Sequence, residues 1–150
     1  MSLGAVAYRP ATAADLEPIC RLLVELTLPT AGVGDWLPQF TVAELPSGLV
    51  GTAGVETYPD GALLRSVAVH PSMQGAGLGR TLTEAAITTA RIAGAKEVYL
   101  LTTTAAAYFP RLGFTEVDRS GIPESVRSSV EFREACPASA IAMHLALPEA

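Results

Sequence analysis

A glycine-rich turn is the segment of this sequence best suited to holding a ligand. Residues 74–79 read QGAGLG, between the apolar run SVAV (66–69) and a stretch of helix-forming residues. A turn from a strand into a helix leaves the first amide N–H groups of the helix unpaired, at the positive end of its dipole. Glycines remove the side chains that would keep a phosphate away from these amides. The turn therefore predicts a phosphate site, with Arg80 as an added cation; the alternative is a tight turn that packs helix on sheet.

Two familiar phosphate motifs do not account for this turn. A P-loop needs Gly-Lys-Ser/Thr, whereas Gly79 is followed by Arg80 and Thr81. The dinucleotide fingerprint G-x-G-x-x-G needs a glycine at position 80 or 82, where Arg80 and Leu82 stand. Neither motif therefore identifies the phosphate-bearing ligand that this turn would bind.

Composition indicates one globular domain, residues 1–150. Hydrophobic residues make up 49% of the 150 positions and charged residues 17%, which suits a chain with a proper core. The net charge of −5, with Lys96 as the single lysine, argues against a nucleic-acid partner. No apolar run reaches the roughly 18 residues of a membrane span, and the start lacks signal-peptide features. Cys20 and Cys136 indicate no disulfide framework, so we expect a cytoplasmic protein without membrane association.

The hydrophobic pattern predicts a mixed α/β fold around the turn. Helical spacing predicts one helix from Thr12 to about Pro29 and another that follows the turn and ends near Gly94. The segment 28–40 is expected to be a loop or broken helix. Further predicted elements are strands at 6–9, 40–45, 48–57, 62–69, 97–101, 114–118 and 141–147, a short helix at 104–112, and partial helix at 123–134. The order strand, turn, helix, strand from 62 to 101 is a parallel crossover in a mainly antiparallel sheet.

Two motifs resemble those of the GCN5-related N-acetyltransferase (GNAT) superfamily. QGAGLG (74–79) matches its Gln/Arg-x-x-Gly-x-Gly/Ala signature, and YFPRLGF (108–114) resembles its later aromatic-x-x-Leu-Gly-Phe segment. The two motifs lie in register, about one helix and one strand apart, and the order of elements agrees along nearly the whole chain. The resemblance implies a mostly antiparallel sheet in which two splayed parallel strands, 62–69 and 97–101, hold acetyl-coenzyme A. The implied activity is N-acetyl transfer to an amine.

The resemblance also implies which residues bind the coenzyme. Backbone groups of Val67, Ala68 and Val69 would pair with the pantetheine arm like an extra strand, and an amide there would polarise the thioester carbonyl. The pyrophosphate would lie on the amides of the turn, namely Gln74, Gly75, Ala76, Gly77, Leu78, Gly79 and Arg80.

The late aromatic segment departs from the superfamily pattern. Many members place a tyrosine four residues before the glycine of Leu-Gly-Phe, to protonate the departing thiolate, but this position is Phe109. The neighbouring Tyr108 is the candidate general acid. One residue turns a helix by about 100°, so its hydroxyl is expected to point in another direction, and a half-buried aromatic is the alternative. A coenzyme A thiolate is a tolerable leaving group, so acid catalysis can be dispensable.

Residues 100–129 indicate which members of the superfamily this chain resembles most. Their Thr-Thr, aromatic-Phe, Val-Asp and Ile-Pro-Glu features resemble the acetyltransferase domain of N-acetylglutamate synthases, which also carry phenylalanine at the tyrosine position. LLRS (63–66), the TTTA run (102–105) and CPASA (136–140) resemble small N-acetyltransferases associated with arsenic resistance. The implied acceptor is an amino acid or a glutamate analogue that contains phosphorus or arsenic. No spacing of ligand residues predicts a metal site, and Cys20 is expected in the core.

Glu56 and Arg65 are the candidates for chemistry on the acceptor. An amine attacks only when neutral, so a base would help, and Glu56 lies on the strand before 62–69; a solvent-facing glutamate is the alternative. Arg65 interrupts an apolar strand and by alternation shares a face with Leu63, Val67 and Val69. Its charge must be paired there, either with the carboxylate of an amino-acid acceptor or structurally with an acid such as Glu56.

Each of the remaining candidate site residues could instead have a purely structural role. They are the bases His70 and His144, the arginines Arg127 and Arg133, the hydroxyls of Thr102–Thr104, and Trp36 in the loop 28–38, which is expected to shape the acceptor pocket. His70 is more simply structural, His144 is expected on a sheet edge, and the threonines are expected to cap the next helix.

Three functions fit the sequence. A small-molecule N-acetyltransferase is the leading interpretation, since several arginines suit an anionic acceptor. A non-catalytic regulator that binds coenzyme A and a protein N-acetyltransferase are the alternatives. A homodimer is a common arrangement in the superfamily, and the sequence leaves the oligomeric state open.

Overall fold

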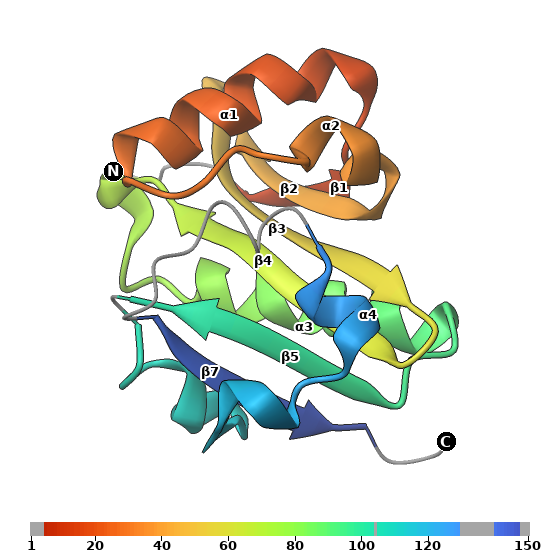
Figure 1. The fold of residues 1–150 in the computed structure, drawn as a ribbon. Helices are drawn as coiled ribbons and strands as arrows, with labels where there is room; N and C mark the ends of the chain where they lie inside the picture. The colour runs from red at the N-terminus through yellow and green to blue at the C-terminus, as the bar shows by residue number, and fades with distance from the viewer. Residues whose placement is uncertain (1–4, 104, 130–139, 148–150) are drawn as a thin grey trace.

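The fold is a seven-stranded mixed sheet covered by helices (Figure 1). The computed structural model describes residues 5–103, 105–129 and 140–147. The strand order is β1-β2-β3-β4-β5-β7-β6. Neighbouring strands pair antiparallel except β4 and β5, which are parallel. The predicted mixed α/β sheet with one parallel crossover is therefore confirmed.

The elements have the following bounds. The strands are β1 (Ala7–Pro10), β2 (Phe40–Leu45), β3 (Gly48–Tyr58), β4 (Gly61–Val69), β5 (Glu97–Thr102), β6 (Thr115–Val117) and β7 (Ile141–Ala146). The helices are α1 (Leu16–Glu25), α2 (Val33–Trp36), α3 (Leu78–Ile92) and α4 (Glu124–Arg127). Within the ranges described, none of these helices is long and apolar enough to cross a membrane.

The predicted short helix at 104–112 is wrong. Its described part forms a turn and then one 3₁₀ segment, Phe109–Leu112, which ends at Gly113 with φ +99°. Pro110 has no N–H to donate to an α-helical ladder, which favours the shorter form. Of the predicted helical stretch 123–134, only α4 falls within the described residues and is helical; residues 130–134 lie outside them.

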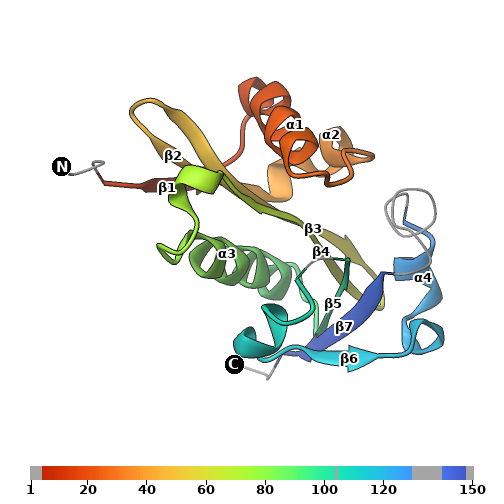
Figure 2. The same cartoon turned by 90° about the vertical axis from the view of Figure 1, so that its left-hand side faces the viewer.

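Helices α1 and α3 pack on opposite faces of the sheet, each over its own core (Figure 2). The buried stripe of α3 recurs every four residues along one side, which is the spacing of an amphipathic helix: Leu78, Leu82, Ala86 and Ala90. On the other face, α1 buries Ile19, Leu22 and Leu23 with Phe40 and Val42 of β2. Both helices thus hold the same central strands, from opposite sides.

Strands β4 and β5 pair only where both begin. Their ladder consists of Ala62 with Val98 and Leu63 with Tyr99, and beyond these pairs the strands diverge (Figure 1). Beside the opening, the β3–β4 register shifts, and Ser66 has φ +58°, so β4 carries a bulge there. The two splayed parallel strands predicted from the sequence are confirmed.

The bulge changes which side chains of β4 share a face. Val67 and Val69 pack against the core beneath α3, whereas Leu63 packs in a separate cluster with α4. Arg65 lies on the Leu63 side, where it contacts the loop after α1. The expectation that Arg65 shares a face with Val67 and Val69 is therefore wrong, because the extra residue at Ser66 reverses the alternation beyond it.

Candidate active site

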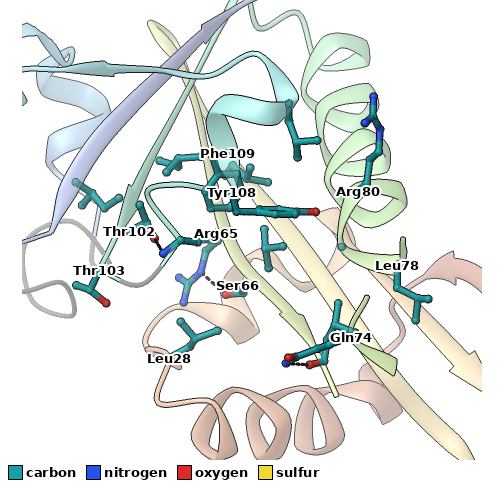
Figure 3. A pocket seen from close by; sticks show the side chains of 18 of the residues that line it. Leu28, Arg65, Ser66, Gln74, Leu78, Arg80, Thr102, Thr103, Tyr108 and Phe109 are labelled. Atoms are coloured by element: carbon teal, nitrogen blue, oxygen red, sulfur yellow. Dashed lines mark hydrogen bonds between the residues drawn. The ribbon is translucent and has the colours of Figure 1, made fainter. Parts of the chain in front are cut away.

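A cleft of about 1150 Å³ lies where β4 and β5 diverge (Figure 3). Its walls are the second halves of both strands, the turn before α3, the first turn of α3, the segment around Tyr108 and the end of α1. Because α1 and α3 lie on opposite faces of the sheet, the cleft has walls from both faces. A ligand bound here can therefore be approached by a second ligand from the other side.

Most residues predicted to bind the coenzyme line this cleft. They are Val67, Val69, Gln74, Gly75, Gly77, Leu78, Gly79 and Arg80. Ala76 is not among the lining residues, and the Ala68 side chain is buried in the core beneath α1. The side-chain amide of Gln74 donates to the Val69 carbonyl at 3.0 Å, which joins the turn to the end of β4.

Two glycines of the turn have a backbone conformation that other residues rarely adopt. Gly75 has φ +85° and Gly77 has φ +87°. Among the described residues, and leaving aside the chain neighbours, no atom lies within 4 Å of a Cβ built on either, so the space above them is open. Gly77 is the N-cap of α3, and its carbonyl accepts from the Thr81 amide. The amides of 78–80 precede this bond and have no partner within the helix, as an anion site at a helix start requires.

Gly79 is required for a different reason. A Cβ at this position would lie 2.9 Å from the hydroxyl of Tyr108, which therefore rests against the first turn of α3 (Figure 3). The neighbouring Phe109 is buried, and its ring lies edge-on to that of Tyr108, with the ring centroids 5.3 Å apart. Burial raises the pKa of Tyr108, so the phenol is protonated at neutral pH. Tyr108 thus lines the cleft, on the side of α3.

Glu56 and Arg65 form a buried ion pair beside the cleft. Nη1 of Arg65 lies 2.8 Å from Oε2 of Glu56, and the side chains are 0% and 2% exposed. The other carboxylate oxygen of Glu56 accepts a hydrogen bond from the Tyr58 hydroxyl. Burial and this hydrogen bond raise the pKa of Tyr58, so its hydroxyl stays protonated and donates to Glu56. The structural pair that the sequence left open as an alternative is the arrangement observed.

Arg65 also fixes the loop that follows α1. Its Nη1 donates to the Ala31 carbonyl at 2.6 Å and its Nη2 to the Pro29 carbonyl at 3.4 Å. Its Nε donates to the hydroxyl of Ser66 at 2.9 Å. Arg65 lines the cleft and Glu56 does not, so the carboxylate lies behind the guanidinium. This position does not suit Glu56 as a base, which must reach the amine directly or through one water.

The weaker candidates have structural surroundings. Nδ1 of His70 accepts from the Ser72 amide at 3.1 Å, and the Thr102 hydroxyl accepts from the Ala105 amide at 2.9 Å, so each caps a local turn. His144 pairs with Glu97. The expectation that His144 lies on a sheet edge is wrong, because β7 pairs with both β5 and β6.

Leu28 and Pro29, in the loop after α1, line the cleft. That this loop shapes the acceptor pocket stays a prediction. Trp36 lies outside the lining and stacks on Tyr58, with ring centroids 5.5 Å apart. Cys20 packs beside the core beneath α1, as expected. Arg127 is exposed on α4. Thr104, Arg133 and Cys136 lie outside the described residues, and within those described no cluster of three or more His, Cys, Asp or Glu could hold a metal ion.

Sequence reasoning missed three residues of this region. Tyr58 secures Glu56, Ser66 forms the bulge, and Arg111 lines the cleft near Tyr108. The polar pair Arg65-Ser66 within an apolar strand was a signal for Ser66. Tyr58 ends β3 and Arg111 lies in the 3₁₀ segment, and no sequence pattern distinguishes either position.

Comparison with known proteins identifies the family. Residues 37–116, more than half of the chain, match the family model described as an acetyltransferase (GNAT) domain. The chain belongs to the GNAT acetyltransferases. Among curated proteins, the amino-acid acetyltransferase of Enterobacter sp. (strain 638) is 27% identical over 99 residues, and that of Escherichia coli (strain K12) is 26% identical over 99. These matches cover 65% of this chain but only 22% of each relative, so the GNAT chain spans about a fifth of their length.

Solved structures share the fold along nearly the whole chain. Rv2747 from Mycobacterium tuberculosis, in complex with CoA and NLQ, has a TM-score of 0.79 and 25% identity, and the match covers 95% of this chain and 99% of that one. N-acetylglutamate synthase from Neisseria gonorrhoeae, complexed with coenzyme A and N-acetyl-glutamate, has a TM-score of 0.82 and 22% identity, over 97% of this chain and 36% of that one. The second likeness shows the fold alone.

The ion pair makes a direct prediction about Glu56. We expect Glu56→Gln to lower the free energy of unfolding by about 3 kcal/mol, because it leaves the buried charge of Arg65 without its counter-ion. Urea denaturation measures this loss. Glu17→Gln, which removes an exposed pair with Arg21, is the matched control and should change stability by less than about 0.5 kcal/mol. A Glu56→Gln protein of unchanged stability that has lost only its turnover would instead identify a catalytic base.

The contact between Gly79 and Tyr108 makes a second prediction. Alanine forms helix better than glycine by about 1 kcal/mol, so Gly79→Ala should stabilise the protein once the Tyr108 ring is removed. With Tyr108 present, the new methyl group displaces its hydroxyl, and the gain should vanish. Urea denaturation of the double-mutant cycle with Tyr108→Ala measures the coupling. Gly34→Ala is the control, since its nearest contact would be Leu16 at 3.8 Å; equal effects of Gly79→Ala in both backgrounds would disprove the contact.

Proposed function

We propose that the protein transfers the acetyl group of acetyl-coenzyme A to the α-amino group of an amino acid or a close glutamate analogue. The observation that carries this proposal is the cleft between the diverging strands β4 and β5, with the glycine turn on one side and a buried arginine on the other. Family membership supports the reaction type.

The side of the cleft near α3 suits coenzyme A. The amides of 78–80 and the open space above Gly75 and Gly77 fit a pyrophosphate, and Arg80 adds positive charge. In the described part of the chain, the backbone of 67–69 has no partner strand on the side of β5, which suits an extended, amide-bearing pantetheine arm. We assign Tyr108 to this side as a contact of the coenzyme, because its hydroxyl rests against α3. The solved relatives that contain coenzyme A support this assignment.

The side near α1 suits the acceptor. The charged side chains among the described lining residues are Arg65, Arg80 and Arg111, and none is acidic. Arg65 lies on the side of α1, whereas Arg80 and Arg111 lie near Tyr108. A cleft whose described lining has positive charges and no acidic side chain favours an anionic acceptor over a lysine-rich peptide. The amino-acid acetyltransferases among the relatives point to the same class of acceptor.

The reaction on this wall needs little proton transfer by the protein. The amine attacks the thioester carbonyl carbon, a C–N bond forms, and the C–S bond breaks to release coenzyme A as a thiolate. No carboxylate or histidine is found among the described lining residues, so we assign the amine proton to water. The α-amino pKa is near 7.7–8.0 in peptides and higher in free amino acids, so the fraction of neutral amine rises as the pH becomes alkaline. Glu56 then acts as the counter-ion that holds Arg65 in place.

Thiol release from acetyl-coenzyme A tests this function. The acceptors are glutamate, phosphinothricin, arsinothricin, other amino acids and a lysine peptide. We expect saturable turnover with amino-acid acceptors, at a rate that rises with pH as the acceptor amine loses its proton, and little with the peptide. Preference for the peptide would support a protein acetyltransferase. Tight coenzyme binding without turnover of any amine would support the non-catalytic regulator.

A further inference from the structure

Ser66 has the most unusual backbone in β4. Its φ of +58° lies in the left-handed region, which residues other than glycine rarely adopt, least of all within a strand. Such a conformation persists only where the surrounding structure imposes it, and it is concentrated at functional sites. Ser66 is 8% exposed and lines the cleft just beyond the last β4–β5 pair. The bulge therefore directs a serine to the point where the two strands diverge.

The Ser66 hydroxyl has a proton to offer a ligand. A serine hydroxyl has one donor and two lone pairs. One lone pair accepts the Nε–H of Arg65 at 2.9 Å, and among the described residues nothing accepts the serine proton (Figure 3). A hydroxyl that accepts from a cation is polarised and becomes a stronger donor. Its preferred acceptor is an anion.

Arg65 is held so that it supports this hydroxyl. Its Nη1 is engaged by the carboxylate of Glu56 and by the Ala31 carbonyl, which fixes the plane of the guanidinium. The other charged residues of the described wall, Arg80 and Arg111, lie near Tyr108, on the side assigned to the coenzyme. A carboxylate on the α1 side would therefore meet the positive charge of Arg65 through Ser66.

We propose that the Ser66 hydroxyl binds the α-carboxylate of the acceptor, with Arg65 as the positioning residue behind it. This inference rests on the proposed function, since it requires an acceptor that carries both groups. It differs from the simplest form of the sequence hypothesis, in which Arg65 itself binds the carboxylate. It also makes Ser66 the residue that distinguishes α-amino acids from amines without a carboxylate.

The test compares glutamate with its α-carboxamide, which keeps the amine but lacks the charge. In the parent protein, kcat/KM should favour glutamate. Ser66→Ala and Ser66→Gly should each lower kcat/KM for glutamate about tenfold or more, mainly by raising KM, because each loses a hydrogen bond to a charged group. Neither variant should change kcat/KM for the carboxamide much, since the carboxamide lacks that charge. Ser66→Gly matters because glycine adopts the positive φ without strain, so it separates the hydroxyl from the backbone. Thr103→Ala removes another hydroxyl from the cleft wall and should preserve the preference.

Each contrary result has its own meaning. If the parent acetylates glutamate and both Ser66 variants keep the preference, the role of Ser66 is disproved and the proposed function stands. If Ser66→Ala loses the preference but Ser66→Gly retains it, the backbone is responsible and the hydroxyl is not. Loss of the preference in Thr103→Ala alone would place the carboxylate beside Thr103, just after the end of β5. A parent protein that acetylates no amine would overturn the proposed function and this inference together.

Discussion

The early end of the β4–β5 ladder is the constraint on which the rest of the structure depends. Neighbouring strands normally satisfy each other's N–H and C=O groups along their length, but this ladder ends at Leu63 and Tyr99. Backbone groups left without a partner must meet water or a ligand, because burying them unpaired is costly. The glycine turn, the aromatic segment and the loop after α1 all surround this opening. The site is therefore a consequence of the sheet's geometry more than of any one side chain.

Two features maintain the opening from within β4. The bulge at Ser66 turns the strand so that Val67 and Val69 pack beneath α3 while Arg65 faces the other side. The buried guanidinium then connects β3, β4 and the loop after α1 through Glu56 and two backbone carbonyls. A charge this deeply buried is tolerated only with such complete pairing. The same contacts that stabilise the sheet thus shape the wall of the cleft on the side of α1.

Local patterns predicted most of this fold. The strands, both long helices and the glycine turn follow from hydrophobic spacing and turn residues, which act over a few neighbouring positions. The orientation of Arg65 could not be predicted, because strict alternation assumes a regular strand and no glycine or proline marks the bulge at Ser66. The pairing of Glu56 with Arg65 could not be predicted either, because it depends on the register between β3 and β4, which is fixed only when the sheet packs. At 104–112 the pattern indicated a helix, and Pro110 with Gly113 limited it to one short turn.

The most direct test of the account is a crystal structure of the protein with coenzyme A. The account predicts the pantetheine arm alongside 67–69 in the opening between β4 and β5, with the pyrophosphate on the amides of 78–80. Coenzyme bound on another surface, and not in this opening, would contradict the central claim.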